Sequence, residues 1–250
     1  MRKTITKFVG TLPRAFIAGA ALACSLATPV WALPITKQLV VTVRVVCDNA
    51  GLNCASTGPI GNPFFEDEAD KIWAQAGIDI KFVTGATLNS TALLNGQNSV
   101  IDFTPAQTMG TGTTMFLANT LTGGLFGEAY INNGGLVINM SAVTAFNMGI
   151  GRLDTIAHEL GHNLGIGHDD TNSRFLMASG GIRNIPSSLG QICPDPTLAT
   201  CFDLLSAAHI ANAFDSDLLI PFVEAPEPTG LALVAVALLA AGLARRRRRT

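Results

Sequence analysis

The sequence predicts an α+β fold in a single domain. The segment Lys37–Cys47 is rich in β-branched residues, and Ile78–Val83 alternates apolar with polar residues, so both are typical of strands. Between them, the apolar residues of Pro63–Gly77 form one helical stripe, and a helical period returns in Gly151–Asn163. A chain of 250 residues with 48% hydrophobic content can build one substantial core once its terminal targeting segments are removed.

The first half of the domain alternates between strand, turn and helix patterns. After the strand Lys37–Cys47, residues typical of turns continue up to Pro63. The helix expected over Pro63–Gly77 has acidic residues in its first turn and closes at Gly77, which suits a helix end. After the strand Ile78–Val83, the polar segment Gly85–Ser99 is expected to be irregular.

The second half begins with strands and ends with helices. Strands are expected near Val100–Phe103 and Thr114–Ala118. In Ala129–Met140, two β-rich halves flank Asn132–Gly135, which resembles a hairpin turn. Helices are expected over Gly151–Asn163 and Asp203–Phe214, and an acidic, proline-containing linker follows the last helix.

The amino terminus has the pattern of a secretory signal peptide. Basic residues precede an apolar run from Ala15 to Ala27, and small side chains near Ala32 predict cleavage after that residue. An uncleaved anchor is the alternative, although the apolar run is short for a membrane span. We therefore assign residues 1–32 to a signal peptide, 33–223 to the main domain and 224–250 to a linker and tail.

The carboxyl terminus has three parts in a fixed order. Pro226-Glu227-Pro228 precedes an uncharged run from Thr229 to Ala244, and Arg245–Arg249 follow. The run predicts a short membrane helix with the main domain outside the cytoplasm. The order resembles the PEP-CTERM sorting tail of Gram-negative bacteria, which implies transient membrane anchoring, processing by an exosortase, and delivery to the cell envelope or the extracellular space. A plain carboxyl-terminal anchor is the alternative.

The charge of the main domain disfavours two classes of partner. Between Leu33 and Pro228 there are 18 acidic and 7 basic residues, which gives a net charge near −11. Such a surface disfavours binding to nucleic acid or to anionic lipid.

Four cysteines lie in the main domain: Cys47, Cys54, Cys193 and Cys201. An even number in an exported chain predicts disulfides, and the two close pairs favour the local connectivity, Cys47 with Cys54 and Cys193 with Cys201. A cysteine-rich metal site is the alternative, but these spacings match no usual zinc knuckle.

The segment from His158 to His168 carries the chemistry. On a helix, residues four apart share a face, so His158 and His162 can reach one ion, with Glu159 beside them. Gly165 can end the helix in the left-handed conformation, which turns the chain back and brings His168 to the same ion. Three imidazoles leave a fourth tetrahedral position open, as in catalytic zinc sites. The sequence thus predicts one catalytic zinc ion, with Glu159 as general base; nothing in it decides a calcium requirement.

The pattern HExxHxxGxxH, with Met177 nine residues after His168, resembles the metzincins, a group of zinc metallopeptidases. The resemblance implies a zincin fold, in which a mixed twisted sheet packs on a backing helix and an active-site helix. It also implies a Met-turn, with Met177 packed beneath the imidazoles, and a carboxyl-terminal helix. Asp169 after the third histidine is similar to reprolysins and the short loop to Met177 is similar to matrixins, so both subfamilies stay open.

The resemblance also implies that substrate lies extended along an edge strand. We assign this strand to Gly135, Leu136, Val137, Ile138 and Asn139. An ordinary hairpin strand is the alternative. No tyrosine follows Met177 and no cysteine-switch propeptide is recognisable, so a tyrosine ligand and that form of latency are not expected.

Several other residues have two interpretations. Tyr130 lies near the expected cleft or in the core, and His209 is interpreted as structural. Asp154 either orients an imidazole or caps the helix. Asp169 and Asp170 either brace the Met-turn or are solvated.

These patterns together predict an exported zinc endopeptidase that acts on extracellular or envelope proteins. One alternative is a surface or matrix protein that keeps the zinc site without turnover. The other is an amidase that acts on cell-wall peptide.

Overall fold

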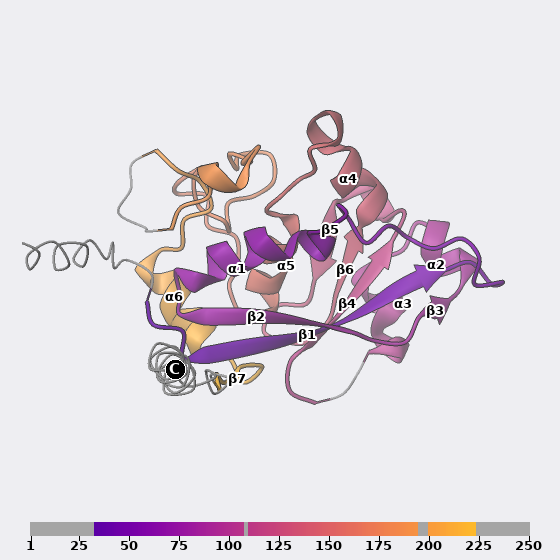
Figure 1. The fold of residues 1–250 in the computed structure, drawn as a ribbon, viewed down its shortest axis with the longest axis horizontal. Coiled ribbons are helices and arrows are strands. Elements are labelled where there is room, and N and C mark those ends of the chain that lie inside the picture. Colours follow the sequence, from indigo (N-terminus) through magenta and orange to yellow (C-terminus); the bar gives the residue numbers. More distant parts are fainter. Residues whose placement is uncertain (1–32, 108–109, 195–199, 224–250) are drawn as a thin grey trace, which may run out of the picture. The chain divides into compact units, whose positions relative to one another are not determined.

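A computed structural model of the protein describes residues 33–107, 110–194 and 200–223 (Figure 1). The chain divides into two units, residues 1–30 and 31–250, and every described residue belongs to the second. The expected signal peptide, the sorting motif, the apolar run and the arginine tail lie outside the described residues. Within the described part, no helix has the length and apolar character needed to cross a membrane.

A mixed sheet is the frame of the domain. Its main strands lie in the order β2 (Ile78–Thr84), β1 (Lys37–Cys47), β4 (Thr113–Ala118), β6 (Leu136–Asn139) and β5 (Gly127–Ala129). The first four are parallel, whereas β5 runs antiparallel to β6 at the end of this order. Two short strands, β3 (Leu88–Asn89) and β7 (Ile220–Pro221), pair with the ends of β1.

The sheet is buried most deeply at its centre. In β1, alternate residues such as Leu39, Val41 and Val43 are buried, as the alternation of side chains along a strand requires. All six residues of β4 and all four of β6 are buried. These central strands are therefore covered on both faces, which is typical of parallel strands.

Helix α1 (Glu66–Ala74) backs the site by packing on β2 and on helix α5 (Thr155–Asn163) (Figure 1). Its stripe of Ala69, Ile72 and Trp73 is buried, and the indole of Trp73 donates to the carbonyl of Ala157 at 3.3 Å. Helix α5 in turn packs on β5 and β6. The α+β fold with a backing helix and an active-site helix is confirmed.

The helix predicted from Pro63 begins later than expected. A 3₁₀ turn, η1 (Pro63–Phe65), precedes α1, and Phe64 and Phe65 have φ angles of 61° and 53°. These left-handed residues interrupt a continuous helix, so α1 starts at Glu66. The chain after α1 turns at Gly77, with φ of 69°, as predicted.

The strand predicted near Val100–Phe103 is wrong, because that segment is helix α3. The backbone N–H of Ser99 donates to the Asp102 carboxylate at 2.8 Å, and that of Val100 donates to Glu128 at 2.9 Å. Side chains thus satisfy donors at the start of the helix, which favours the helix over a strand. The preceding polar segment, expected to be irregular, contains helix α2 (Thr91–Asn95) as well as β3.

The predicted hairpin is present as β5 and β6, but Met140 begins helix α4 (Met140–Gly149) and does not end a strand. The Asn139 side chain caps α4 by accepting from the N–H of Ala142 at 3.0 Å. The last helix, α6 (Ala207–Phe214), starts after the predicted Asp203, which has a φ of 57°. The remaining 3₁₀ turns are η2 (Thr104–Ala106), η3 (Thr122–Gly124) and η4 (Leu189–Gln191).

Both predicted disulfides are confirmed. Cys47 is bonded to Cys54 and Cys193 to Cys201. The first closes the loop after β1, and the second closes a loop before α6.

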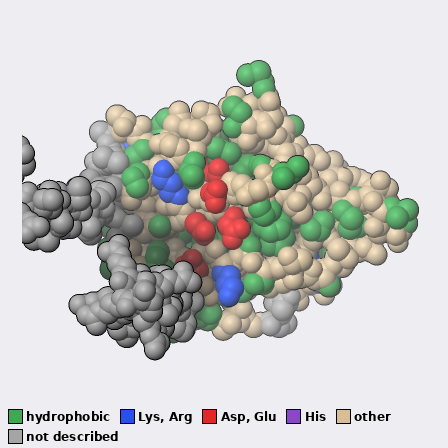
Figure 2. All heavy atoms as spheres, viewed as in Figure 1, with side chains coloured by type: hydrophobic (Ala, Val, Ile, Leu, Met, Phe, Trp, Pro, Cys, Tyr) green, Lys and Arg blue, Asp and Glu red, His purple; other side chains and the backbone are tan. Residues whose placement is uncertain are grey.

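Acidic side chains gather on the face over α1 and β2 (Figure 2). The first turn of α1 contributes Glu66 and Asp67, near the helix amino terminus, where negative charge is favourable, whereas Glu68 of the same turn is buried.

Candidate metal centre

Helix α5 and the loop that follows it bring three imidazoles together. The ring centroids of His158 and His162 lie 4.8 Å apart, and His168 lies 5.4 Å from the first ring and 4.8 Å from the second. One nitrogen of each ring lies within 4.8 Å of the others, so the three can reach one ion. His158 and His162 are buried, whereas His168 is exposed.

The turn after α5 places His168. The N–H of Ile166 donates to the carbonyl of Gly161 at 3.0 Å, and that of Gly165 donates to His162 at 2.9 Å. This pair of bonds is a Schellman motif, and Gly165 has a φ of 90°, which a residue with a side chain adopts only with strain. The helix therefore ends at a point that allows the chain to return to the metal site.

Backbone carbonyls orient the two buried imidazoles. Nδ1 of His158 lies 2.7 Å from the carbonyl oxygen of Leu176, and Nδ1 of His162 lies 2.8 Å from that of Ile166. A protonated Nδ1 that donates to a carbonyl leaves Nε2 with its lone pair free for a metal. The donor set therefore fits zinc, which prefers neutral imidazole nitrogens.

The surroundings keep these imidazoles neutral. Burial lowers the pKa of His158 well below its usual value, and the positive charge of Arg183 lowers it further. Burial also lowers the pKa of His162. Neutral rings are the form that binds a metal, so no proton has to be displaced near neutral pH.

Met177 lies beneath the metal site. Its side chain is fully buried, and a Cβ added at Gly161 would collide with the Met177 sulfur, so the loop packs directly on α5. The N–H of Asp169 donates to the carbonyl of Met177 at 2.9 Å, and the Asp170 carboxylate accepts from the N–H of Ser179 at 2.7 Å. Both aspartates therefore join the segment after His168 to the Met177 loop.

His209 and Tyr130 lie outside the metal site. His209 of α6 pairs with the Asp169 carboxylate at 3.1 Å, which ties α6 to the same loop. The hydroxyl of Tyr130 lies 2.6 Å from that of Thr104, and its ring packs against the core. The structural interpretation of both residues agrees with these contacts.

Glu159 lies against the edge strand. A Cβ added at Gly127 of β5 would lie 2.6 Å from Cγ and 2.8 Å from Oε1 of Glu159. Burial raises the pKa of the Glu159 carboxyl to about 8, Arg183 opposes this rise and Glu128 adds to it. A cation held by the histidines acts in the same direction as Arg183 and favours the ionised base.

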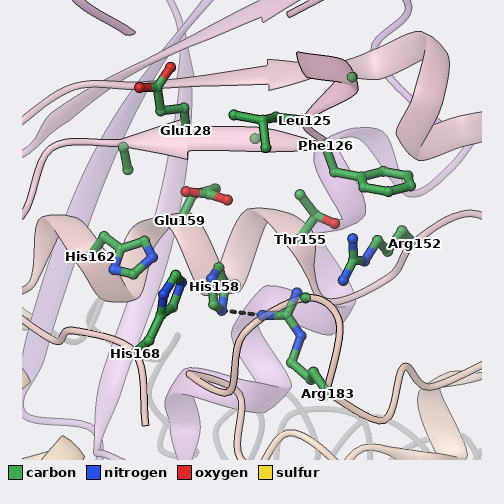
Figure 3. Close-up of a pocket in the computed structure, with 14 residues that line it drawn as sticks. Leu125, Phe126, Glu128, Arg152, Thr155, His158, Glu159, His162, His168 and Arg183 are labelled. Atoms are coloured by element: carbon green, nitrogen blue, oxygen red, sulfur yellow. Dashed lines mark hydrogen bonds between the residues drawn. The ribbon is translucent and has the colours of Figure 1, made fainter. Parts of the chain in front are cut away.

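A cavity of about 340 Å³ opens over these residues (Figure 3). The histidines and Glu159 form its floor, and β5 with the preceding Leu125 and Phe126 forms one wall. A second wall contains Arg152, Thr155 and Arg183.

The predicted edge strand, Gly135–Asn139, is wrong. Strand β6 pairs with β4 on one side and β5 on the other, and all its residues are buried, so it offers no free edge. The strand at the end of the sheet order is β5, and Gly127, Glu128 and Ala129 line the cavity. The sequence analysis placed the edge strand one strand too deep, because pairing order is not readable from a hairpin pattern alone.

A buried ionic cluster beside the cavity was not expected from the sequence. Asp154 is fully buried and pairs with Arg183, with Nε 2.6 Å from Oδ2. Arg183 also donates to the carbonyls of Leu176 and Ala178 and contacts Nδ1 of His158. Asp154 thus acts on His158 through Arg183, and its side chain does not cap α5. One pattern could have indicated this cluster: the main domain has only seven basic residues, and two of them line the cavity.

Asn163 was also missed by the sequence analysis. Its side chain is fully buried, accepts from the Thr113 hydroxyl at 2.6 Å, and donates to the carbonyls of Tyr130 and Gly135. It therefore fastens the end of α5 to β4 and to the hairpin loop. Its position between two ligands in HExxHxxGxxH was the pattern that could have marked it.

Residues 77–169 match the model of the reprolysin-like metallopeptidases of family M12B, a segment that is less than half of the chain and contains all three histidines and Glu159. No curated protein matches the chain. Among solved structures, the archaemetzincin of Methanopyrus kandleri is 14% identical, with a TM-score of 0.44 over 72% of this chain and 95% of that one. The archaemetzincin of Archaeoglobus fulgidus, complexed with malonate, is 18% identical, with a TM-score of 0.37 over 56% and 85%.

The fold is a metzincin-like zincin fold, with a mixed sheet, a backing helix and an active-site helix. Its three-histidine centre is a zinc site. The family match and the centre together support a zinc metallopeptidase domain.

Proposed function

We propose that this protein is an exported zinc-dependent endopeptidase, with Glu159 as its general base. The observation that carries the proposal is that Glu159 lies in the same cavity as the three histidines, although it is not one of the metal-binding set. A purely structural zinc site has no use for a carboxylate held in that position.

The residues of the chain have separate roles in this proposal. When zinc is bound, it supplies a Lewis acid that polarises a carbonyl and lowers the pKa of water. The Glu159 carboxylate takes a proton from the attacking water and returns it to the leaving amine nitrogen. The carbonyl carbon gains a bond to oxygen and loses its bond to nitrogen, so atoms and protons balance.

Strand β5 is the proposed guide for the substrate. Its backbone faces the cavity at Gly127 and Ala129, and one of its sides is occupied by β6. An extended peptide that pairs with the other side adds a strand to the sheet and lies across Glu159. The three-residue length of β5 suits a short contact around the scissile bond.

Export is the second part of the proposal. The two disulfides support an oxidising compartment, because such bonds form and persist outside the reducing cytosol. The signal-peptide pattern and the PEP-CTERM-like tail support passage to the envelope of a Gram-negative cell, with an exosortase-like partner. The net negative charge of the main domain disfavours nucleic acid as a partner.

The test of this function is chelator-sensitive proteolysis. We expect zinc-loaded protein to cleave unfolded casein at internal bonds, to lose this activity in a chelator, and to regain it when zinc is restored. Mass spectrometry of the products measures where the bonds are cut. Cleavage of crosslinked peptidoglycan with casein left intact would favour the amidase. Zinc binding without any cleavage would favour the surface protein without turnover.

A further inference from the structure

The Arg152 side chain forms one end of the cavity. In Figure 3, His162 and His168 lie toward one end and Arg152 toward the other, with Glu159 and His158 between them. Only 8% of the Arg152 side chain is exposed, and it lines the cavity. A guanidinium buried at this depth normally has a full set of acceptors, because it carries five N–H donors and cannot lose its charge.

Arg152 lacks those acceptors. Among the residues that the structure describes, its guanidinium makes no hydrogen bond, and Nε is buried without a hydrogen-bond partner. The nearest carboxylate oxygen, Oδ1 of Asp154, lies 3.8 Å from Nε. The side chain is held by aromatic rings, with its Cζ 4.4 Å from the centroid of Phe126 and 5.7 Å from that of Phe146. These contacts fix the guanidinium but leave its donors unused.

The nearby carboxylates leave Arg152 without a hydrogen-bonded counterion. Asp154 is already paired with Arg183 at 2.6 Å. Asp203 is fully buried, and burial, followed by repulsion from Asp154, raises its pKa well above its usual range. Within the cluster, the Asp154 carboxylate thus lies 2.6 Å from Arg183 but 3.8 Å from Arg152, so it gives Arg152 a distant counterion and no hydrogen bond.

We propose that Arg152 binds a carboxylate of the substrate, so that the cavity selects peptides with an acidic group beside the scissile bond. This inference rests on the proposed peptidase function. An Arg guanidinium and a carboxylate can form two parallel charge-assisted hydrogen bonds, which supply both affinity and orientation. Glu128 lies in the same cavity, away from Arg152 (Figure 3), so acidic groups are disfavoured at that position. The carboxylate comes from an Asp or Glu side chain or from a free peptide carboxyl terminus.

The test compares metal-anchored probes that differ in one group. Two peptide hydroxamates, identical except for Glu or Gln next to the hydroxamate, are titrated into zinc-loaded protein by calorimetry. A second pair carries a free carboxylate or a carboxamide at the peptide end. We expect the acidic member of at least one pair to bind at least about tenfold more tightly, as a charge-assisted hydrogen bond implies. The pair that shows the difference identifies the source of the carboxylate.

Variants assign the preference to Arg152. In Arg152→Gln, the ratio of the dissociation constants of the neutral and acidic probes should fall to about one. In Arg152→Lys, which keeps the charge but not the planar pair of N–H donors, this ratio should be intermediate. Lys81→Gln is the matched control, because it removes one positive charge from an exposed position outside the cavity and should keep the parental ratio. If Arg152→Gln does not fold, the parental ratio and the Lys variant still decide the proposal.

The outcomes separate this inference from the proposed function. The inference is overturned if the parent protein binds the acidic and neutral probes of both pairs equally. It is also overturned if a folded, zinc-bearing Arg152→Gln variant keeps the parent's preference for the acidic probe. A preference for the acidic probe without cleavage of any peptide would support carboxylate binding while removing the peptidase function. Cleavage of peptides without an acidic preference would remove the inference alone.

Discussion

The contact between Gly127 and Glu159 sets the position of the general base. The backbone of β5 approaches the Glu159 side chain so closely that a methyl group at residue 127 would lie 2.6 Å from Cγ. The absence of a side chain at Gly127 is therefore as important to the site as the carboxylate. Sequence patterns mark the glutamate, but the glycine becomes visible only when β5 is placed beside α5.

Replacement of Gly127 with Ala should reduce peptide hydrolysis while zinc content stays near the parental value. The added methyl displaces Glu159, and a displacement of about 1 Å in a catalytic group can lower the rate about a hundredfold. Zinc stoichiometry by mass spectrometry of the metal, together with kcat on a casein-derived peptide, measures the two effects.

The control for this change is Gly181→Ala. A Cβ at Gly181 meets nothing within 4 Å, and the residue is exposed on the loop near Arg183. Parental hydrolysis in Gly127→Ala, or equal losses in both variants, would contradict the steric role of Gly127.

At the scale of elements, a carboxyl between α1 and β2 lowers the free energy of unfolding as pH rises. Asp70 on α1 has its pKa raised to about 7 by burial and by the negative charges of Asp79, Glu66 and Asp67. Its Oδ1 is buried and has no hydrogen-bond partner among the described residues. A carboxyl whose folded pKa exceeds its usual 3.8 lowers the free energy of unfolding as pH rises. The loss begins near the usual pKa and is complete above the folded value.

Asp70→Asn should therefore stabilise the protein at pH 8 and have little effect near pH 4. The gain at pH 8 should be about 1 kcal/mol, or roughly 2–4 °C in Tm, because solvent screens this partly exposed carboxyl and reduces the full effect. Differences in Tm between variant and parent at each pH give the result, since pH-dependent loss of zinc cancels in the difference.

Asp217→Asn serves as the control for Asp70→Asn because Asp217 is exposed, does not act on Asp70, and undergoes the same charge change. An equal gain in Tm at pH 4 and pH 8 in Asp70→Asn would exclude the ionisation of Asp70 as the cause.

Long periodic elements were predictable, and short ones were not. The first strand has the predicted bounds Lys37–Cys47, and α5 ends where Gly165 predicted, because each pattern repeats within its own segment. The predicted start of that helix at Gly151 is wrong, since Gly151 has a φ of 99° and α5 begins at Thr155. Val100–Phe103 was mistaken for a strand, since a segment of three apolar residues and Asp102 does not reveal that Glu128 accepts from the N–H of Val100. That bond joins residues 28 apart in the sequence, beyond the reach of a local pattern.

The same contrast between local patterns and long-range contacts holds for the residues of the site. The metal-binding histidines and Glu159 come from one continuous motif, so helix geometry together with a turn at Gly165 predicts their grouping. Arg152 precedes α5 in the chain and Arg183 follows it, and both side chains line the cavity. The Asp154 carboxylate between them lies closer to Arg183 than to Arg152. Three-dimensional packing decides which guanidinium has the close carboxylate, so the sequence does not show it.

At the scale of the whole molecule, we propose that targeting segments at both termini flank the disulfide-bonded domain. The described domain carries the site, and the PEP-CTERM-like tail follows at Pro226–Pro228. If that tail is a processing signal, protein recovered from a host with an active exosortase should lack Arg245–Arg249. Intact-mass analysis measures the loss directly. A full-length form held in the membrane of that host would favour the plain anchor.

The central claim is that three histidines hold zinc while Glu159 moves the proton. Its most direct test measures zinc stoichiometry and peptide hydrolysis together in Glu159→Gln and His162→Gln, with Glu66→Gln as a control for the same chemical change outside the cavity. Glu159→Gln should keep about one zinc per chain and lose at least about a hundredfold in hydrolysis, because it removes a base and no metal-binding group. His162→Gln should lose the zinc itself, since two imidazoles bind the ion much more weakly. A Glu159→Gln variant that binds zinc and cleaves at the parental rate would contradict the account.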